Sequence, residues 1–270
     1  MIRMFSFLAG LFFVAALGWS FLWGSVNFAS EGLPKTVEHE FHKHPKELAL
    51  SSDGPFGKFD HQQLQRGFKV YQEVCAACHS LRLVAYRDLK ALGYNDDEVK
   101  AIAAKATIPD YNAHTGELKS RPGLPTDHFP PVVYGGQGTP PDLSLMTKAR
   151  HEGPAYVYSV LTGYQDQPAE VLKEFPDAKV PSGLHYNPYF ANLNIAMPPP
   201  LTSDGQVTYS DGTKASVDQM SKDVAAFLVW TAEPKLDKRH QTGIAVLGFL
   251  LFAAVLAYMA YRNVWAGLKH

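Results

Sequence analysis

The stretch that decides the fold of this chain is residues 61–79, HQQLQRGFKVYQEVCAACH. Its apolar side chains recur at spacings of three and four, which places them near one face of a helix: Leu64, Phe68, Tyr71 and Val74. This periodicity predicts a helix over residues 61–74. The helix would lead directly into both cysteines of the chain, Cys75 and Cys78, and into His79.

The segment Cys75-Ala76-Ala77-Cys78-His79 is a C-x-x-C-H pentapeptide. On one helical turn, both thiols can reach the vinyl groups of a haem while the adjacent imidazole faces the iron. A thioredoxin-like redox pair would follow a strand, and a zinc site would need two more ligands at short spacing. The pattern therefore predicts one covalently attached haem c, with Cys75 and Cys78 as its attachment residues and His79 as an axial ligand.

Met197 is the best candidate for the second axial ligand. It precedes Pro198-Pro199-Pro200, whose fixed φ angles stiffen the loop that carries the sulfur. A thioether ligand favours ferrous iron and raises the reduction potential, which suits an electron carrier. Met146 is a weaker candidate, and Met220 lies on the apolar stripe of a predicted helix, where it would fill the core. The rival ligands are histidines: His128, His151 and His185.

The composition limits the class of protein. The chain has 270 residues, of which 46% are hydrophobic, and its 25 Lys and Arg residues nearly balance its 26 Asp and Glu residues. This balance provides no broad basic field, so we expect no nucleic-acid partner. Only two cysteines are present, which excludes a disulfide-stapled secreted scaffold. Three histidines near the N-terminus are expected to be exposed loop residues rather than a metal site: His39, His42 and His44.

Two stretches are apolar enough to enter a membrane. Residues 242–261 carry no charge, and about 20 residues rising about 1.5 Å each can cross a hydrocarbon core of about 30 Å. We therefore expect a transmembrane helix over residues 241–262 and a cytoplasmic tail over residues 263–270. Residues 4–26 are also uncharged, and they predict that residues 1–30 form either a signal sequence or an N-terminal membrane anchor.

Either role of the N-terminus would place residues 31–240 on the far side of the membrane. In a bacterium this side is the periplasm, so we expect a protein of the bacterial inner membrane with a periplasmic haem domain. Apolar spacing predicts three more short helices in this part, over residues 96–105, 154–161 and 216–231. Long proline-marked loops separate the helices, over residues 121–141 and 176–200.

These elements predict a mainly α fold. The helix over residues 61–74 is expected to cross the helix over residues 216–231, with Gly67 permitting close approach and the haem between them. The predicted fold is a cytochrome c-like haem domain with long loop insertions, followed by a C-terminal transmembrane helix.

Several short motifs, in this order and spacing, resemble one family. They are Arg66-Gly67-Phe68-Lys69-Val70-Tyr71 before the pentapeptide, Arg121-Pro122-Gly123, Pro140-Pro141-Asp142-Leu143-Ser144, Leu161-Thr162-Gly163-Tyr164, Asn187-Pro188-Tyr189-Phe190 and Ile195-Ala196-Met197. From about Phe56 to its end, the chain resembles cytochrome c1, the haem subunit of the cytochrome bc1 complex.

The resemblance implies roles for individual residues. It implies that Met197 is the second axial ligand and that Arg150 and Tyr156 contact the haem propionates, since a guanidinium pairs with carboxylates and a phenol donates to them. It also implies that Pro140 or Pro141 offers a carbonyl to the ring nitrogen of the haem-ligating histidine that is not bound to iron, which would fix the orientation of the ring.

The resemblance further implies electron transfer. The haem would accept single electrons from the Rieske iron-sulfur protein and pass them to a cytochrome c, beside cytochrome b, in a respiratory or photosynthetic chain. On its own, the chain would be an electron-transfer subunit and not an enzyme. Two other classes stay open: an independent membrane-tethered cytochrome c, and an enzyme such as a peroxidase whose haem iron has an open position.

Overall fold

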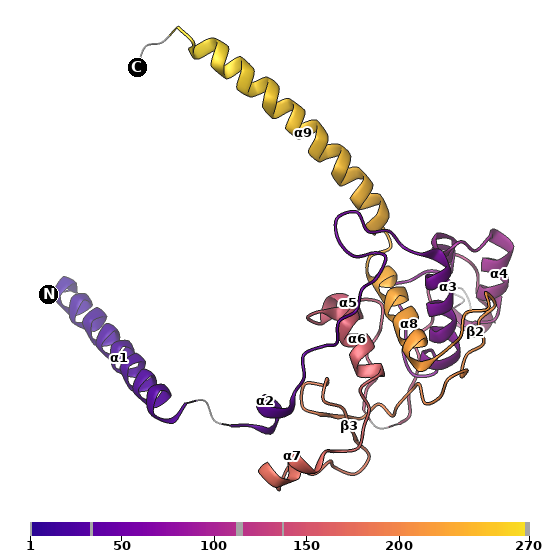
Figure 1. Ribbon diagram of the computed structural model, residues 1–270, viewed down its shortest axis with the longest axis horizontal. Helices are drawn as coiled ribbons and strands as arrows, with labels where there is room; N and C mark the ends of the chain where they lie inside the picture. The colour runs from indigo at the N-terminus through magenta and orange to yellow at the C-terminus, as the bar shows by residue number, and fades with distance from the viewer. Residues whose placement is uncertain (1, 33–34, 112–115, 137, 268–270) are drawn as a thin grey trace.

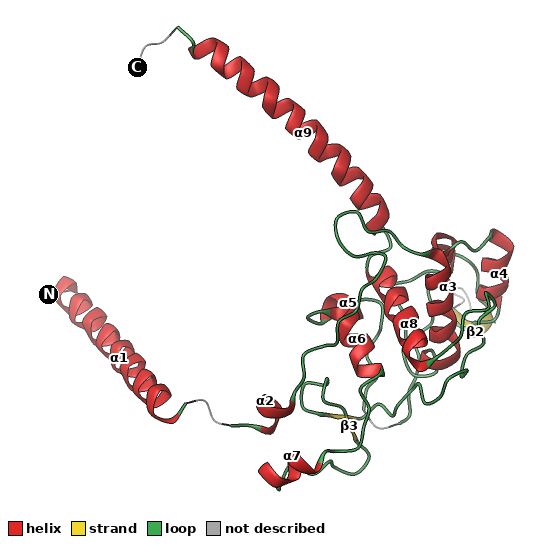
Figure 2. Ribbon diagram, in the orientation of Figure 1, coloured by secondary structure: helices red, strands yellow, loops and turns green. Residues whose placement is uncertain are grey.

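The computed structural model describes residues 2–32, 35–111, 116–136 and 138–267. Two long helices, α1 (Ile2–Glu31) and α9 (Leu236–Trp265), project from a helical domain (Figure 1). Both have the length and apolar composition needed to cross a membrane, and neither apolar stretch is buried against the domain. Figure 2 shows that the domain itself consists of short helices joined by long loops, so the predicted mainly α fold is confirmed.

Two crossing helices form the centre of the domain, α3 (His61–Val70) and α8 (Val217–Ala232). The Asp60 carboxylate accepts hydrogen bonds from the N–H groups of Gln62 and Gln63 in the first turn of α3. The Ser216 hydroxyl accepts one from the Gln219 N–H in the first turn of α8. At the crossing, a Cβ atom on Gly67 would overlap the carbonyl oxygen of Asp223 and the Cβ atom of Phe227. The expected close approach at Gly67 is therefore confirmed.

Aromatic rings fill the space beside this crossing. The Phe227 ring of α8 lies 5.5 Å from that of Phe68, 5.8 Å from that of Tyr71 and 5.7 Å from that of Trp230, measured between ring centroids. Met220 is fully buried in the same core, which confirms the expectation that it is a packing residue. The helix pair therefore supplies a rigid base for the segment that follows α3.

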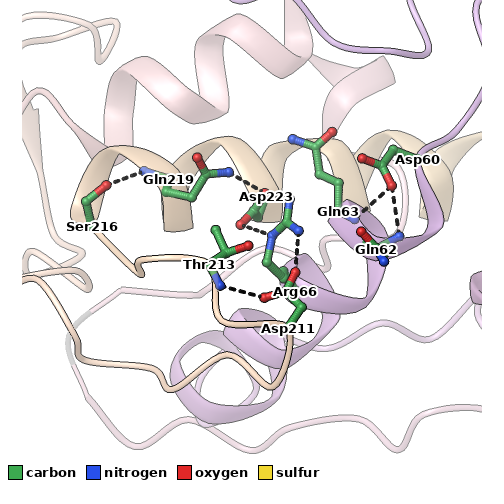
Figure 3. A network of polar contacts seen from close by, with 9 residues as sticks. All are labelled: Asp60, Gln62, Gln63, Arg66, Asp211, Thr213, Ser216, Gln219 and Asp223. Atoms are coloured by element: carbon green, nitrogen blue, oxygen red, sulfur yellow. Dashed lines mark hydrogen bonds and ion pairs between the residues drawn. The ribbon is translucent and has the colours of Figure 1, made fainter.

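A buried ion pair also joins the two helices (Figure 3). Arg66 of α3 donates from Nε to the Asp223 carboxylate of α8 over 2.9 Å and from Nη1 to Asp211 over 2.7 Å. Asp223 is completely buried, and the Gln219 amide donates a further hydrogen bond to it over 2.9 Å. A buried carboxylate needs such partners, because an unpaired charge in the interior is costly.

Smaller elements surround this core. They are α2 (Val37–Phe41), the π-helical turn η1 (Tyr71–Cys75), the 3-10 helix η2 (Tyr86–Leu92), α4 (Asp96–Ala104), α5 (Met146–Ala149), α6 (Gly153–Leu161) and α7 (Ala169–Glu174). Two antiparallel pairs of strands complete the domain: β1 (Thr107–Tyr111) with β2 (Leu118–Pro122), and β3 (His185–Tyr186) with β4 (Asn194–Ile195). The helices predicted over residues 96–105, 154–161 and 216–231 are confirmed to within one residue at each end.

Two expectations from the sequence need correction. The helix predicted over residues 61–74 is α-helical only to Val70 and then continues as the π-helical turn η1. The loop predicted over residues 121–141 begins inside β2, because the hairpin of β1 and β2 carries prolines and exposed side chains in place of apolar alternation.

The base of α9 is fastened to the domain. The Asp237 carboxylate accepts a hydrogen bond from the Phe59 N–H over 3.2 Å, and the His240 Nδ1 lies 2.9 Å from the Gly57 carbonyl oxygen. Leu236, the first residue of α9, is buried. The apolar helix is therefore held against the loop that precedes α3.

Candidate functional site

A cavity of about 600 Å³ lies between α6, α8 and the segment that follows α3. Apolar side chains make up most of its wall: Val74, Leu143, Met146, Val157, Val160, Leu161, Phe190, Ile195, Val224 and Leu228. Its size and apolar lining are typical of a site for a cofactor.

All six site residues predicted from the sequence line this cavity: Cys75, Cys78, His79, Arg150, Tyr156 and Met197. Met146 also lines it, whereas Met220 does not. Within the part of the chain that the structure describes, the rival histidines lie elsewhere. The backbone of His128 pairs with that of Ala85, His151 is exposed, and His185 borders a second cavity of about 590 Å³ that contains neither cysteine.

The helix widens just before the two cysteines, both of which line the cavity. In η1, the Ala76 N–H donates to the Tyr71 carbonyl over 2.8 Å, five residues back instead of four. The next turn is closed by the His79 N–H, which donates to the Cys75 carbonyl over 2.9 Å. Burial raises the pKa of the Cys75 thiol to about 12, whereas the attacking cysteine of a redox-active C-x-x-C pair has a lowered pKa. The surroundings of Cys75 therefore do not favour a redox pair.

The imidazole of His79 has a fixed orientation. Its Nδ1 lies 2.8 Å from the Pro141 carbonyl oxygen, so Nδ1 carries the proton that it donates to this acceptor. The expected acceptor, the carbonyl of Pro140 or Pro141, is thus that of Pro141. The Tyr71 hydroxyl donates to the His79 carbonyl over 3.0 Å. This arrangement leaves Nε2 available for a metal.

Met197 is positioned by a loop that carries little regular structure. It follows the two-residue strand β4 and precedes Pro198. Two side chains fasten this loop to the end of α6. Asn187, which is completely buried, donates from Nδ2 to the Val160 carbonyl over 2.8 Å. The Tyr164 hydroxyl donates to the Met197 carbonyl over 3.0 Å.

Arg150 and Tyr156 lie together at the cavity. The guanidinium carbon of Arg150 is 6.0 Å from the centroid of the Tyr156 ring, and Arg150 is exposed. Among the described residues that line the cavity, Arg150 is the one with a permanent positive charge. A cation and a phenol beside an apolar cavity suit the carboxylates of an amphipathic cofactor.

The site also contains residues that the sequence did not single out. Tyr134 and Thr139 line the cavity, and Tyr164 and Asn187 hold the loop of Met197. The last two belong to motifs that carry the family resemblance, which is the signal that could have identified them. No group of three or more His, Cys, Asp or Glu side chains within the described ranges is arranged to bind a metal ion, and the three histidines near the N-terminus are exposed.

The fold and the cavity define a helical protein with an apolar anchor and a site whose donors, an imidazole and a thioether beside two cysteines, fit a haem c. A sequence model described as the cytochrome C1 family matches residues 50–268. The chain belongs to the cytochrome c1 family. Cytochrome c1 is the membrane-anchored haem subunit of the cytochrome bc1 complex in respiratory or photosynthetic chains, so membership implies a haem cofactor, as the resemblance predicted.

Three relatives illustrate this similarity. Cytochrome c1 of Rhodospirillum rubrum is 42% identical over 234 residues, which cover 80% of this chain and 86% of that protein. The mitochondrial cytochrome c1 1 haem protein of Arabidopsis thaliana is 41% identical over 255 residues, covering 91% and 80%. A protein of Bradyrhizobium diazoefficiens named cytochrome b/c1 is 44% identical over 236 residues, covering 79% of this chain and 34% of that protein.

Proposed function

We propose that this chain carries one covalently attached haem c and passes single electrons from the Rieske iron-sulfur protein to a cytochrome c within the cytochrome bc1 complex. The observation that carries the proposal is the convergence of Cys75, Cys78, His79 and Met197 on one cavity. Met197 lies 118 positions after His79, so sequence proximity does not explain why it meets the other three residues at one cavity.

Each side chain at the cavity has a role in this proposal. When bound, haem c supplies an iron that gains and loses one electron. Cys75 and Cys78 provide the two thioether attachments. His79 would hold the iron through Nε2, because its Nδ1 donates to the Pro141 carbonyl. Met197 would hold it through its thioether sulfur, which would raise the reduction potential, and these two ligands would leave no position on the iron for a substrate.

The remaining cavity residues would hold the cofactor in place. Arg150 offers a guanidinium and Tyr156 a phenol, and both groups can bind the propionate carboxylates. The apolar side chains that line the cavity would limit the access of water to the haem, which also affects its reduction potential. With both His79 and Met197 bound to the iron, the haem would serve electron transfer and would not react as that of a peroxidase.

The proposed position in the membrane follows from α9 and from the N-terminal helix. We place residues 31–240 in the periplasm of a bacterium, residues 241–262 in the inner membrane and residues 263–270 in the cytoplasm. Residues 1–30 are a signal sequence or a second anchor. Cytochrome b is the proposed neighbour in the membrane, and the relative named cytochrome b/c1 supports this choice, since its name joins both proteins.

The membrane partner can be tested by purification. The full-length protein, tagged and extracted in a mild detergent, is expected to copurify with a b-type cytochrome and an iron-sulfur protein. In this preparation, an added quinol should reduce the haem c, and the reduced haem c should then reduce an added cytochrome c. Purification without any b-type partner would contradict the proposal and would favour an independent membrane-tethered cytochrome c.

The axial ligand can be tested by substitution. Met197→Leu removes the sulfur while keeping the size of the side chain, so the ferrous protein should bind carbon monoxide and the reduction potential should fall. Met146→Leu is the matched control, because Met146 is the other methionine among the described residues that line the cavity. The assignment is wrong if Met146→Leu has these effects, or if the wild-type ferrous protein already binds carbon monoxide promptly.

A further inference from the structure

The backbone of Met197 is held from outside its own loop. Tyr164 lies three residues after the end of α6, and its hydroxyl donates to the Met197 carbonyl oxygen over 3.0 Å, across 33 positions of sequence. We propose that Tyr164 is a positioning residue that fixes the backbone of Met197 and thereby directs the thioether toward the cavity. This inference rests on the proposed role of Met197 as an axial ligand.

The local structure around Met197 explains why an outside hydrogen bond matters. The ladder between β3 and β4 ends with the pair of His185 and Ile195, so Met197 lies beyond its backbone hydrogen bonds. Pro198 restricts Met197 to extended backbone conformations but has no N–H group to donate to a neighbouring carbonyl. The hydroxyl of Tyr164 provides the contact that the ladder does not.

Tyr164 itself is held in a defined position. It follows Gly163, where a Cβ atom would overlap the ring of Tyr189 and the carbonyl oxygen of Ser159. The loop that carries Met197, residues 187–200, therefore packs directly on the end of α6. The hydrogen bond from Asn187 to the Val160 carbonyl, 2.8 Å long and buried, fastens the same loop at a second point.

The same helix also forms part of the cavity. Tyr156, Val157 and Val160 of α6 line it on one side, while the end of the helix supports the loop of Met197. A displacement of Met197 relative to α6 would thus change the distance between the sulfur and the rest of the cavity. The Tyr164 hydroxyl is the group that opposes this displacement at the methionine itself.

The test compares two isosteric variants of the full-length, haem-loaded protein in its complex. Tyr164→Phe removes the hydroxyl that donates to Met197. Tyr158→Phe removes a hydroxyl on α6 itself, which donates to the Asp218 carboxylate over 2.6 Å and not to the backbone of Met197. Each variant loses one hydrogen bond, and the bond of Tyr158 goes to a carboxylate, so a purely structural effect should be at least as large in Tyr158→Phe.

Two properties of the ferric protein report the bond between sulfur and iron: the charge-transfer absorption band of that bond and the affinity for added imidazole, which competes with the thioether. A hydrogen bond contributes about 0.5–1.5 kcal/mol, so Tyr164→Phe should bind imidazole about 2- to 12-fold more tightly and weaken the band. Tyr158→Phe should leave both properties unchanged. The reduction potential should fall in Tyr164→Phe and not in Tyr158→Phe.

Met197→Leu, measured in parallel, separates the inference from the function on which it rests. If Met197→Leu abolishes the band while Tyr164→Phe retains wild-type imidazole affinity, the positioning role of Tyr164 is wrong and the ligand assignment stands. If Met197→Leu retains the band, the proposed ligand is wrong and the role of Tyr164 fails with it. Equal changes in Tyr164→Phe and Tyr158→Phe would also overturn the positioning role.

Discussion

The two proposed iron ligands are held by regions built in different ways. His79 belongs to what we call the histidine wall, which consists of α3, residues 71–79 and α8, and which packs around buried aromatic rings. Met197 belongs to the methionine loop, residues 187–200, which has one two-residue strand and is fastened by side-chain hydrogen bonds. One ligand is therefore fixed by helix packing and the other by a few polar contacts, so mutations in the two regions should have different effects.

The largest effect should come from adding a side chain between α3 and α8 where they cross in the histidine wall. In Gly67→Ala, the added Cβ atom would overlap the carbonyl of Asp223 and the Cβ atom of Phe227, neither of which can move unless the helices separate. We expect a loss of about 3 kcal/mol or more in the free energy of unfolding and little haem-loaded protein in the membrane. Thermal unfolding of the full-length protein in detergent measures the loss.

Gly135→Ala is the control for this substitution, because an added Cβ atom there meets nothing within 4 Å. If the two alanine variants unfold at the same temperature, the helices do not depend on close contact at Gly67.

An effect of comparable size is expected at the buried ion pair. Asp223→Ala leaves the Arg66 guanidinium without its buried partner and should cost about 3–5 kcal/mol in the free energy of unfolding. Asp211→Ala removes a carboxylate that is 25% exposed and should cost about 1 kcal/mol or less. Chemical denaturation of both variants gives the ranking, and equal losses would show that the buried member is not the dominant partner.

The methionine loop should respond locally. Asn187→Ala removes the side-chain donor of the buried Val160 carbonyl and an acceptor for the Tyr189 N–H, at a cost of about 1–3 kcal/mol. Limited proteolysis should then cut within residues 187–200, while the histidine wall keeps its protection. Asn192→Ala, at an exposed position of the same loop, is the matched control. Cleavage that begins in α3 or α8 would refute the separation of the two regions.

The smallest effect concerns acid pH. Phe129, whose ring packs against Tyr71 of the histidine wall, lies just after Asp127. Hydrogen bonds from the Arg121 side chain and the Leu124 N–H lower the pKa of Asp127 from 3.8 to about 2. A carboxyl whose pKa is lowered by folding adds stability above its unfolded pKa and loses this contribution as the pH falls through its folded pKa.

In Asp127→Asn, we therefore expect a lower free energy of unfolding at neutral pH and a shallower decrease between pH about 4 and about 2 than in the wild type. Unfolding measured as a function of pH gives the difference between the two proteins. The amide of Asn187 does not titrate in this range, so its hydrogen bond to the Val160 carbonyl should persist. A constant difference between wild type and variant across this range would contradict the assignment.

The sequence could predict most of the histidine wall because its determinants are local. The spacing of apolar residues and the pentapeptide define α3, the cysteines and His79 within one continuous stretch. The π-helical turn was not predictable, since one extra residue in a turn leaves the apolar spacing almost unchanged. The hairpin of β1 and β2 was missed because exposed strands with internal prolines lack the alternation that identifies a strand.

The methionine loop was predictable only in part. The prolines after Met197 indicate a stiff segment, which is a local property. The hydrogen bonds from Asn187 to Val160 and from Tyr164 to Met197 join residues that are 27 and 33 positions apart. Such contacts depend on how the helices pack, and the spacing of residues does not encode them. The position of Arg150 beside Tyr156 has the same origin, and without the family resemblance an exposed arginine would be interpreted as a solvated charge.

The central claim is that a porphyrin is bonded to this chain through Cys75 and Cys78. Mass spectrometry of the peptide that spans these residues, after extraction of the purified protein with acidified acetone, tests it most directly. The account predicts a peptide whose mass includes one haem. A peptide with the mass of its amino acids alone, with the pigment recovered in the acetone, would contradict it.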